Sequence, residues 1–353
     1  MKKLTAVLII AFVMLLVLMG LSSNYVMGFF PMSSPPLSQG SVETILEFGT
    51  GNHPEGIALD PQGNIYAGNR QPVNGDVLPV IIKIGPDGTD LEYARLPLTT
   101  RDDAEGLLGL VVSAQGDLYA ALVSLDENHG VWKIGRDGSI ERLSGSDDMN
   151  FPNGLTFDSR GYLYVTDSFG GSIWRFDSQG QGEEWVQHKW LESGENPVGL
   201  VLPGANGIAF FPPDNLYVAN TSLGRLVRIK INQDGSPGEV QSIAHEPLGL
   251  LTMDGIAADA HGDILAVIPG YFVTGTSPVV KIDTKTGKFT GMVYGSDQIA
   301  KFDIPLSLAF GSGARDKQSV YVTNGALEFD FIPPSAGPGV IQVGVGVPGF
   351  QGR

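Results

Sequence analysis

The fold is decided by the stretch Glu55-Gly-Ile-Ala-Leu-Asp-Pro-Gln-Gly-Asn-Ile-Tyr66, because its pattern returns five more times along the chain. The further copies begin at Leu108, Asn153, Asn206, Asp254 and Leu306. Their starts lie about 45 to 53 residues apart, close to the length of one β-propeller blade, about 40 to 50 residues. Six copies therefore predict an all-β, six-bladed propeller.

Each copy begins a blade of four antiparallel strands. A run of small and apolar residues, Gly56–Leu59, is typical of an inner strand, and the turn at Pro61–Gly63 reverses it into the next strand. In the last copy, no fourth strand follows the third strand, Val340–Val343. We therefore predict that Ser41–Phe48 completes blade six, which closes the ring and removes an exposed sheet edge.

The composition agrees with an all-β fold and excludes several kinds of function. The chain has 353 residues with 48 glycines and 23 prolines, as expected for many short strands joined by tight turns. Its net charge of −16 would repel phosphate backbones, which argues against nucleic acid as a partner. It has no cysteine, so disulfides and thiol catalysis are excluded.

The first residues are expected to direct the chain out of the cytosol. Lys2 and Lys3 precede an uncharged apolar run of 18 residues, Leu4–Leu21, which fits both a signal peptide and a retained signal anchor. We assign residues 1–21 to this segment, residues 22–40 to a tether and residues 41–353 to the propeller. The expected location is secreted, periplasmic or membrane-anchored facing outside the cytosol, for a monomer that meets the membrane only through the anchor.

The first residue of every copy opens an inner strand, so these six positions must circle one end of the central channel. They hold Glu55, Leu108, Asn153, Asn206, Asp254 and Leu306. Four of these side chains carry oxygen. Two carboxylates and two carboxamides aimed at one point suit a hard divalent cation, with calcium first and magnesium second.

Several copies resemble a known family. The starts His53-Pro-Glu-Gly-Ile-Ala, Phe151-Pro-Asn-Gly-Leu-Thr, Ala205-Asn-Gly-Ile-Ala and Met253-Asp-Gly-Ile-Ala are similar to those of the senescence marker protein, gluconolactonase and luciferin-regenerating enzyme family of six-bladed calcium-dependent hydrolases. The resemblance implies that Glu55, Asn153, Asn206 and Asp254 bind a catalytic calcium. Sugar-lactone members carry Arg-x-Asn-Asp-Gly where this chain has Arg101-Asp-Asp-Ala-Glu-Gly, so their substrate contacts are not carried over.

Further residues are expected around the same mouth. An outer set could orient the metal ligands or simply cap turns: Asn69, Asp167, Asn220 and Asn324. Aromatic residues of the mouth loops could form a pocket for an apolar substrate group or pack within their loops: Tyr271, Phe272, Phe329 and Phe331. Two histidines near the mouth, His53 and His129, are candidate general bases.

Three functions are compatible with these residues. The first is metal-dependent hydrolysis of a small-molecule substrate, which would be a lactone, an ester or a phosphoester. Either water or Asp254 would attack this substrate. The second is a non-catalytic ligand- or protein-binding propeller with a structural calcium, because a fold alone establishes no chemistry. The third is a metal-independent propeller like strictosidine synthase.

Overall fold

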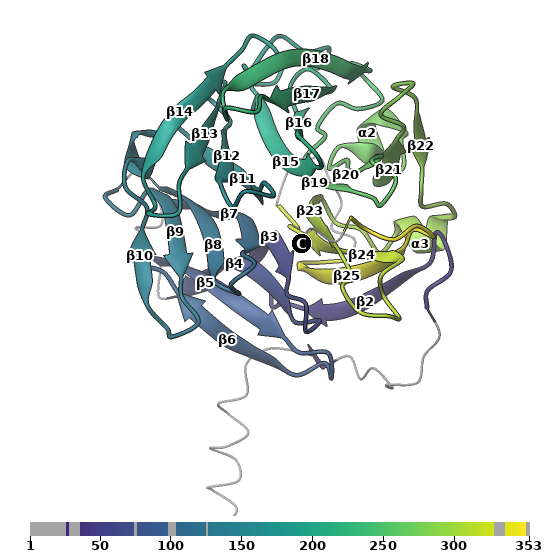
Figure 1. Cartoon of the computed structure of the whole chain (residues 1–353). Coiled ribbons are helices and arrows are strands. Elements are labelled where there is room, and N and C mark those ends of the chain that lie inside the picture. Colours follow the sequence, from purple (N-terminus) through teal and green to yellow (C-terminus); the bar gives the residue numbers. More distant parts are fainter. Residues whose placement is uncertain are drawn as a thin grey trace, which may run out of the picture.

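Six antiparallel sheets stand around a central axis and form a propeller, as the sequence predicts (Figure 1). The computed structural model describes residues 26–27, 36–73, 76–97, 104–124, 126–327 and 336–350. Within these ranges no helix is long and apolar enough to cross a membrane. The predicted signal peptide or anchor, residues 1–21, lies outside the described residues.

The first three blades follow one another along the chain. Blade one consists of β3 (His53–Leu59), β4 (Ile65–Val73), β5 (Asp76–Ile84) and β6 (Asp90–Arg95). Blade two consists of β7 (Ala104–Val112), β8 (Leu118–Ser124), β9 (Gly130–Ile134) and β10 (Ile140–Arg142), followed by the short 3-10 helix η1 (Ser146–Asp148). Blade three consists of β11 (Pro152–Phe157), β12 (Leu163–Asp167), β13 (Ser172–Phe176) and β14 (Gly182–Gln187).

Blades four and five repeat the order, and blade five adds two single-turn helices. Blade four consists of β15 (Ala205–Phe211), β16 (Asn215–Asn220), β17 (Arg225–Ile231) and β18 (Pro237–His245). Blade five consists of β19 (Ile256–Ala258), β20 (Ile264–Val267), β21 (Val279–Ile282) and β22 (Phe289–Gly291). The helix α2 (Tyr271–Thr274) joins β20 to β21, and α3 (Ser296–Ile299) follows β22.

Blade six is assembled from both ends of the chain. It contains β23 (Pro305–Phe310), β24 (Ser319–Asn324) and β25 (Gly339–Gly344), then β2 (Val42–Glu47) and β1 (Val26–Met27). The pairing of β2 with β25 confirms the predicted closure of the ring. The strand β1, which pairs with β2, was not predicted and lies within residues 22–40.

The hydrophobic core lies between neighbouring blades. Tyr164 and Ile173 of blade three, for example, pack with Val218 and Val227 of blade four, and all four side chains are buried. Alternating apolar side chains on each strand thus cover both faces of a sheet, and burial of this surface stabilises the ring.

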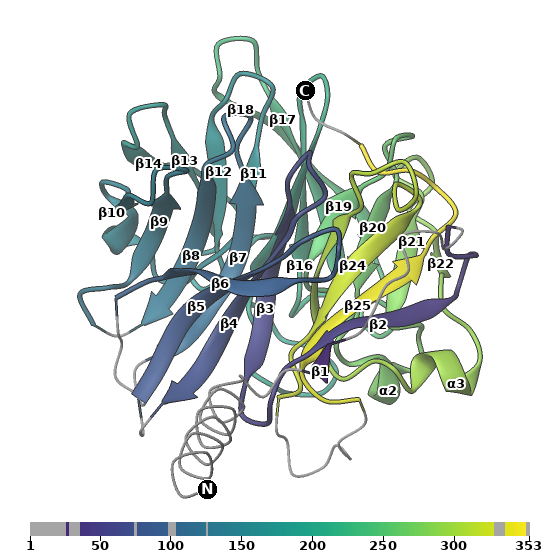
Figure 2. The same ribbon diagram turned by 90° about the horizontal axis from the view of Figure 1, so that it is seen from below.

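All inner strands run in the same direction, so equivalent positions of the six copies lie at one end of the channel. Their place along the strand varies, since Glu55 is the third residue of β3 and Leu108 the fifth of β7. We call this end the ring mouth and define it by Glu55, Leu108, Asn153, Asn206, Asp254 and Leu306. The opposite end, formed by the turns that follow the inner strands, is the far mouth. Figure 2 shows α2 and α3 at the ring mouth and the C-terminal end of the chain at the far mouth.

Candidate metal centre at the ring mouth

Every ring residue lies where the pairing between the first and second strands of its blade is irregular. In blade one Pro54 pairs with Asn69 and Ile57 with Ala67, so one extra residue lies on the inner strand. The same register shift occurs in blades two, three, four and six. Such bulges re-aim side chains and are common beside functional sites.

Blade five reaches a similar arrangement without a continuous strand. The amide of Asp254 donates to the carbonyl oxygen of Val267 at 3.1 Å, and the amide of Val267 donates to the carbonyl oxygen of Gly255 at 3.1 Å. One residue of β20 therefore bonds to two successive residues of the inner strand. The six ring positions thus share one local geometry.

The inner strands approach each other backbone to backbone at the ring mouth. A Cβ added to Gly154 would lie 2.6 Å from the carbonyl oxygen of Asn206, and one added to Gly207 would lie 2.3 Å from the carbonyl oxygen of Asp254. These distances leave no room for a side chain. The glycine after each of these ring residues therefore lets neighbouring ring residues come close together.

A pair of hydroxyl groups holds the two ring asparagines. The Nδ2 amide of Asn153 donates to Ser168 Oγ at 3.2 Å, and Ser168 donates to the carbonyl oxygen of Ala205 at 2.6 Å. The Nδ2 amide of Asn206 donates to Thr221 Oγ1 at 3.0 Å, and Thr221 donates to the carbonyl oxygen of Met253 at 2.8 Å. Because each hydroxyl gives its proton to a carbonyl, it can only accept from the amide, which fixes the amide orientation.

This orientation leaves the oxygen of one carboxamide without a donor. Asn206 is 3% exposed, and its Oδ1 has no hydrogen-bond partner within the described chain. A buried carbonyl oxygen without a partner costs about 1 to 3 kcal/mol. A cation ligated by this oxygen would remove the penalty, so the residues present fit a divalent ion.

Asp254 is the most perturbed carboxyl group at the ring mouth. It is 9% exposed, and burial raises its pKa to about 8, although hydrogen bonds from Asn206 and from the amide of Gly255 act in the opposite direction. Without a cation the carboxyl is mostly protonated at neutral pH. A nearby cation favours the ionised form and lowers the pKa.

The remaining ring positions complete the donor set. Glu55 is half-buried, and its carbonyl oxygen accepts a hydrogen bond of 2.5 Å from Thr323 Oγ1 of blade six, which ties the first blade to the last. Across the described residues, no three histidine, cysteine, aspartate or glutamate side chains gather into a metal-binding group. The oxygen donors that the ring positions offer are two carboxamides and two carboxylates, a set of the kind that suits calcium.

The two candidate general bases differ in their surroundings. His53 Nδ1 lies 3.1 Å from the carbonyl oxygen of Gly325, to which it donates, so its Nε2 can accept a proton. His129 Nδ1 accepts from the amide of Ser124 at 3.2 Å, and its Nε2 lies 2.9 Å from the carbonyl oxygen of Met149. Both nitrogens of His129 bind backbone, so action as a base would require one of these hydrogen bonds to break, and the base role of His129 stays a prediction.

The outer set predicted to orient the ligands binds loop backbone. Asp167 accepts hydrogen bonds from the amides of Asn150, Phe151 and Gly170, with distances of 2.7 to 2.9 Å. Asn220 accepts from the amide of Leu223 and donates to the carbonyl oxygens of Trp190 and Glu192.

The other two members of this set also bind loop residues, one through a side chain and one through backbone. Asn69 donates to the side chain of Asn52, and Asn324 donates to the carbonyl oxygen of Lys301. These contacts correspond to the alternative of turn caps. The groups that do hold ring side chains, Ser168 and Thr221, follow Asp167 and Asn220 directly in the sequence.

The predicted aromatic pocket is described only in part. Tyr271 Oη donates to the carbonyl oxygen of Phe302 at 3.2 Å and its ring packs against Phe302, so it belongs to the packing of α2. Phe272 is exposed. Phe329 and Phe331 lie outside the described residues, as does the segment 101–103.

A cavity of about 1090 Å³ lies at the other end of the channel. It begins at a layer of six buried apolar side chains, each two residues after a ring residue: Ile57, Leu110, Leu155, Ile208, Ile256 and Leu308. It opens at the far mouth, and none of the four oxygen-bearing ring residues lines it. The sequence analysis did not predict this cavity.

The far cavity carries no polar group comparable to Asn206. Its buried carboxylates are paired, since Asp60 binds Asn64 and Tyr66, and Asp158 binds Arg160. Phe350 also lines this cavity and packs against Phe211 with ring centroids 5.4 Å apart. The unsatisfied oxygen of Asn206 therefore favours the ring mouth over this cavity as the chemical site.

Comparisons with known proteins agree with this architecture. The family model described as strictosidine synthase-like, N-terminal, matches residues 41–71. No curated protein matches the chain. Among solved structures, the calcium-binding protein regucalcin from Agrobacterium tumefaciens has 19% identity and a TM-score of 0.62, with 91% of this chain and 98% of that chain covered.

Two further solved structures widen the range of chemistry found on this fold. A gluconolactonase from Xanthomonas campestris has 17% identity and a TM-score of 0.59, with 92% of this chain and 100% of that chain covered. Virginiamycin B lyase from Staphylococcus aureus has 19% identity and a TM-score of 0.52, with 78% of each chain covered. The structural neighbours thus include the gluconolactonase-type propellers that the repeat starts resemble, and the chain shares their six-bladed fold.

Proposed function

We propose that the chain is a calcium-dependent hydrolase that acts on a lactone, ester or phosphoester at the ring mouth. One observation carries the proposal: the buried, donor-free Oδ1 of Asn206 lies on a side chain that is hydrogen-bonded to the raised-pKa carboxyl of Asp254. Without a cation, Asp254 must keep its proton to avoid a buried charge, and a bound cation would replace that proton and also ligate the oxygen of Asn206. The gluconolactonase and regucalcin folds support the same reading.

We assign one set of residues to binding the metal ion and another to orienting its ligands. Glu55, Asn153, Asn206 and Asp254 would hold calcium, or magnesium as the second choice. When bound, the ion supplies Lewis acidity toward the carbonyl or phosphoryl oxygen of the substrate. The hydroxyls of Ser168 and Thr221 accept hydrogen bonds from the amide nitrogens of the asparagines and so fix which end of each carboxamide is the oxygen.

Two groups are placed to move protons or attack. His53, whose Nδ1 is bound to Gly325, presents Nε2 as an acceptor for a proton from water. Asp254 is the alternative, as a base or as a nucleophile, once a cation has ionised it. Phe272, Phe329 and Phe331 remain our candidates for contacts with an apolar group of a small-molecule substrate.

A second candidate function is a metal-independent propeller. The match of residues 41–71 to the strictosidine synthase-like family model favours it. That candidate leaves the unsatisfied oxygen of Asn206 unexplained, which is why we place it second. A non-catalytic propeller with a structural calcium would use the same ring residues.

The export of the chain belongs to the same proposal. Lys2, Lys3 and the apolar run Leu4–Leu21 would act as a signal peptide or an anchor and place the propeller outside the cytosol. Calcium is plentiful there in many environments, and no partner other than a small molecule is needed for the proposed reaction.

The proposal is tested by assaying the purified chain against lactones, aryl esters and organophosphates, before and after chelation. We expect hydrolysis to disappear on chelation and to return when calcium is added. A protein that binds calcium but is inert across the panel would favour the structural role. Hydrolysis that persists after complete removal of the metal would favour the metal-independent candidate.

A further inference from the structure

The exposed apolar side chains of the propeller gather on one side. Among the described residues ten large hydrophobic side chains are exposed, and only Leu91 and Ile140 lie on outer strands away from the ring mouth. Val198, Leu200 and Val201 lie in the connection from β14 to β15, where Val201 is 90% exposed. This connection reaches the ring mouth, because every fourth strand ends there.

The other exposed apolar residues extend the same arc over blades three to five. Phe169 lies in the loop from β12 to β13 and stacks on Phe151, two residues before Asn153. Leu248 lies between β18 and β19, and Phe272 and Val273 belong to α2. Tyr294, between β22 and α3, ends the arc. We call these eight side chains the apolar rim.

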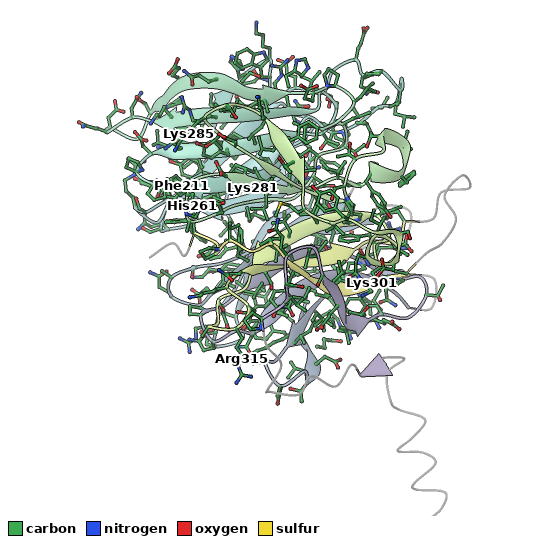
Figure 3. The ribbon with its side chains drawn as sticks, turned by 90° about the vertical axis from the view of Figure 1, so that its right-hand side faces the viewer. Phe211, His261, Lys281, Lys285, Lys301 and Arg315 are labelled. Atoms are coloured by element: carbon green, nitrogen blue, oxygen red, sulfur yellow. The ribbon has the colours of Figure 1, made fainter. Side chains whose placement is uncertain are left out.

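The far mouth has the opposite character. Its turns are polar and glycine-containing, as at Asp87-Gly88, Asp137-Gly138 and Asp234-Gly235. In Figure 3 the exposed side chains of Lys285 and His261 lie toward this mouth, with Lys301 toward the other. Scattered exposed apolar residues are ordinary on a soluble protein, but a one-sided arc marks an interaction surface.

The position of strand β1 indicates what the apolar rim contacts. Val26 of β1 pairs with Glu47 of β2, Glu47 with Gly339, Gly339 with Asn324, and Asn324 with Pro305 at the start of an inner strand. These paired residues form a line across blade six that ends at the start of its inner strand, which is the ring-mouth end. The strand β1 therefore lies on the same side of the propeller as the apolar rim, as Figure 2 shows.

The apolar run Leu4–Leu21 joins the propeller through β1. Only residues 22–25 separate Leu21 from Val26, and five peptide units span at most about 17 Å. A lipid-inserted run of this kind would therefore hold the ring-mouth side, and no other side, close to the bilayer.

We propose that the apolar rim docks on the surface of a neutral lipid bilayer, so that the ring mouth opens toward the membrane. The charges near the rim bear on the choice of lipid: Glu195, Glu246 and Asp297 are exposed there, against the exposed Lys189 and the partly buried Lys301, so acidic groups are in excess. With a net charge of −16 on the whole chain, anionic headgroups are repelled and zwitterionic ones are not. The proposal does not depend on the hydrolytic function.

The absence of cysteine gives a clean test with the full chain. Val201→Cys and Leu248→Cys place an environment-sensitive fluorophore on the rim, and Lys285→Cys and Arg315→Cys place it on exposed positions of the far mouth. All four side chains are exposed, so the substitutions leave the core intact. Each labelled protein is bound to phosphatidylcholine vesicles that contain brominated lipid, which quenches only probes in contact with the acyl chains.

We expect the two rim probes to shift to shorter wavelength and to be quenched at least about 2-fold more than the two far-mouth probes, in high salt as well as low, because apolar burial is not screened. A further Leu248→Asp substitution should reduce quenching at Val201→Cys. The proposal fails if the vesicle-bound chain shows equal quenching at all four positions. It also fails if the rim probes shift without vesicles as protein concentration rises, which would assign the rim to a second copy of the chain.

Discussion

The side-chain amide of Asn206 donates a hydrogen bond of 3.0 Å to the hydroxyl of Thr221, and the Oδ1 of the same carboxamide is left buried without a donor. Blade three repeats the amide contact with Asn153 and Ser168. A hydroxyl group thus decides which end of each carboxamide is available to a cation.

Thr221→Val should weaken calcium binding by about 10- to 100-fold, the usual cost of losing a group that orients a metal ligand. Valine has nearly the same shape but cannot accept from the amide, which then becomes free to turn its nitrogen toward the axis. Thr221→Ser keeps the hydroxyl and should keep most of the affinity. Isothermal titration calorimetry checks both, and equal affinities for the valine and serine variants would contradict the proposed role.

Asp254→Asn should abolish calcium-dependent turnover and leave the fold intact. The asparagine is isosteric but uncharged, so the ring mouth keeps its shape and loses one of its two carboxylates. Thermal unfolding with and without calcium should show that calcium raises the melting temperature of the wild type and has little effect on the variant. Full activity of the variant would remove Asp254 from the mechanism.

The contribution of Asp254 to the stability of the metal-free chain should fall as pH rises from about 4 to 8. The pKa of Asp254 is raised from 3.8 to about 8 in the folded chain, so the folded chain binds more protons than the unfolded chain within this window. The free energy of unfolding then decreases with pH by up to about 1.4 kcal/mol per unit.

Urea unfolding at several pH values measures this effect, and the difference between the wild type and Asp254→Asn isolates the one carboxyl. The difference in the free energy of unfolding between the two proteins should be largest near pH 8 and should vanish near pH 4. Saturating calcium should remove it, because the cation replaces the proton. Parallel pH profiles for the two proteins would show that Asp254 is an ordinary carboxylate.

The two histidines should separate into a chemical and a structural role. His53→Gln should lower turnover by about 10²- to 10⁴-fold, the typical contribution of a general base, with calcium affinity unchanged. His129→Gln should instead lower the melting temperature, because His129 links the backbone at Ser124 and Met149. Steady-state kinetics and thermal unfolding of both variants check this, and a pH–rate profile unaltered by His53→Gln would count against the base.

The sequence alone predicted the six blades and the closure of the ring, because a repeated inner strand fixes both the number of modules and the missing strand. It also placed the four oxygen-bearing residues at one end of the channel, since equivalent positions in a closed repeat must be equivalent in space. The strand β1 escaped prediction because two residues carry no detectable pattern.

The partners of the ring residues could not be predicted, because they depend on the bulge at each ring position. One extra residue on the inner strand shifts the register, so Ser168 and Thr221 meet the asparagines while Asp167 and Asn220 bind loops. The spacing of the repeats along the sequence does not show which residue of the second strand lies opposite each ring residue. The engagement of both nitrogens of His129 and the width of the far cavity likewise follow from three-dimensional packing.

The pairing of β2 with β25 joins a strand made at the beginning of synthesis to one made almost at its end. A ribosome releases residues 42–47 nearly three hundred residues before residues 339–344 exist. Until then β2 has no neighbour on that side, and an arc of blades one to five would leave one apolar blade face uncovered at each end. Blade six can be completed only after residues 339–344 have been made, so closure of the ring is a late step in the assembly of this chain.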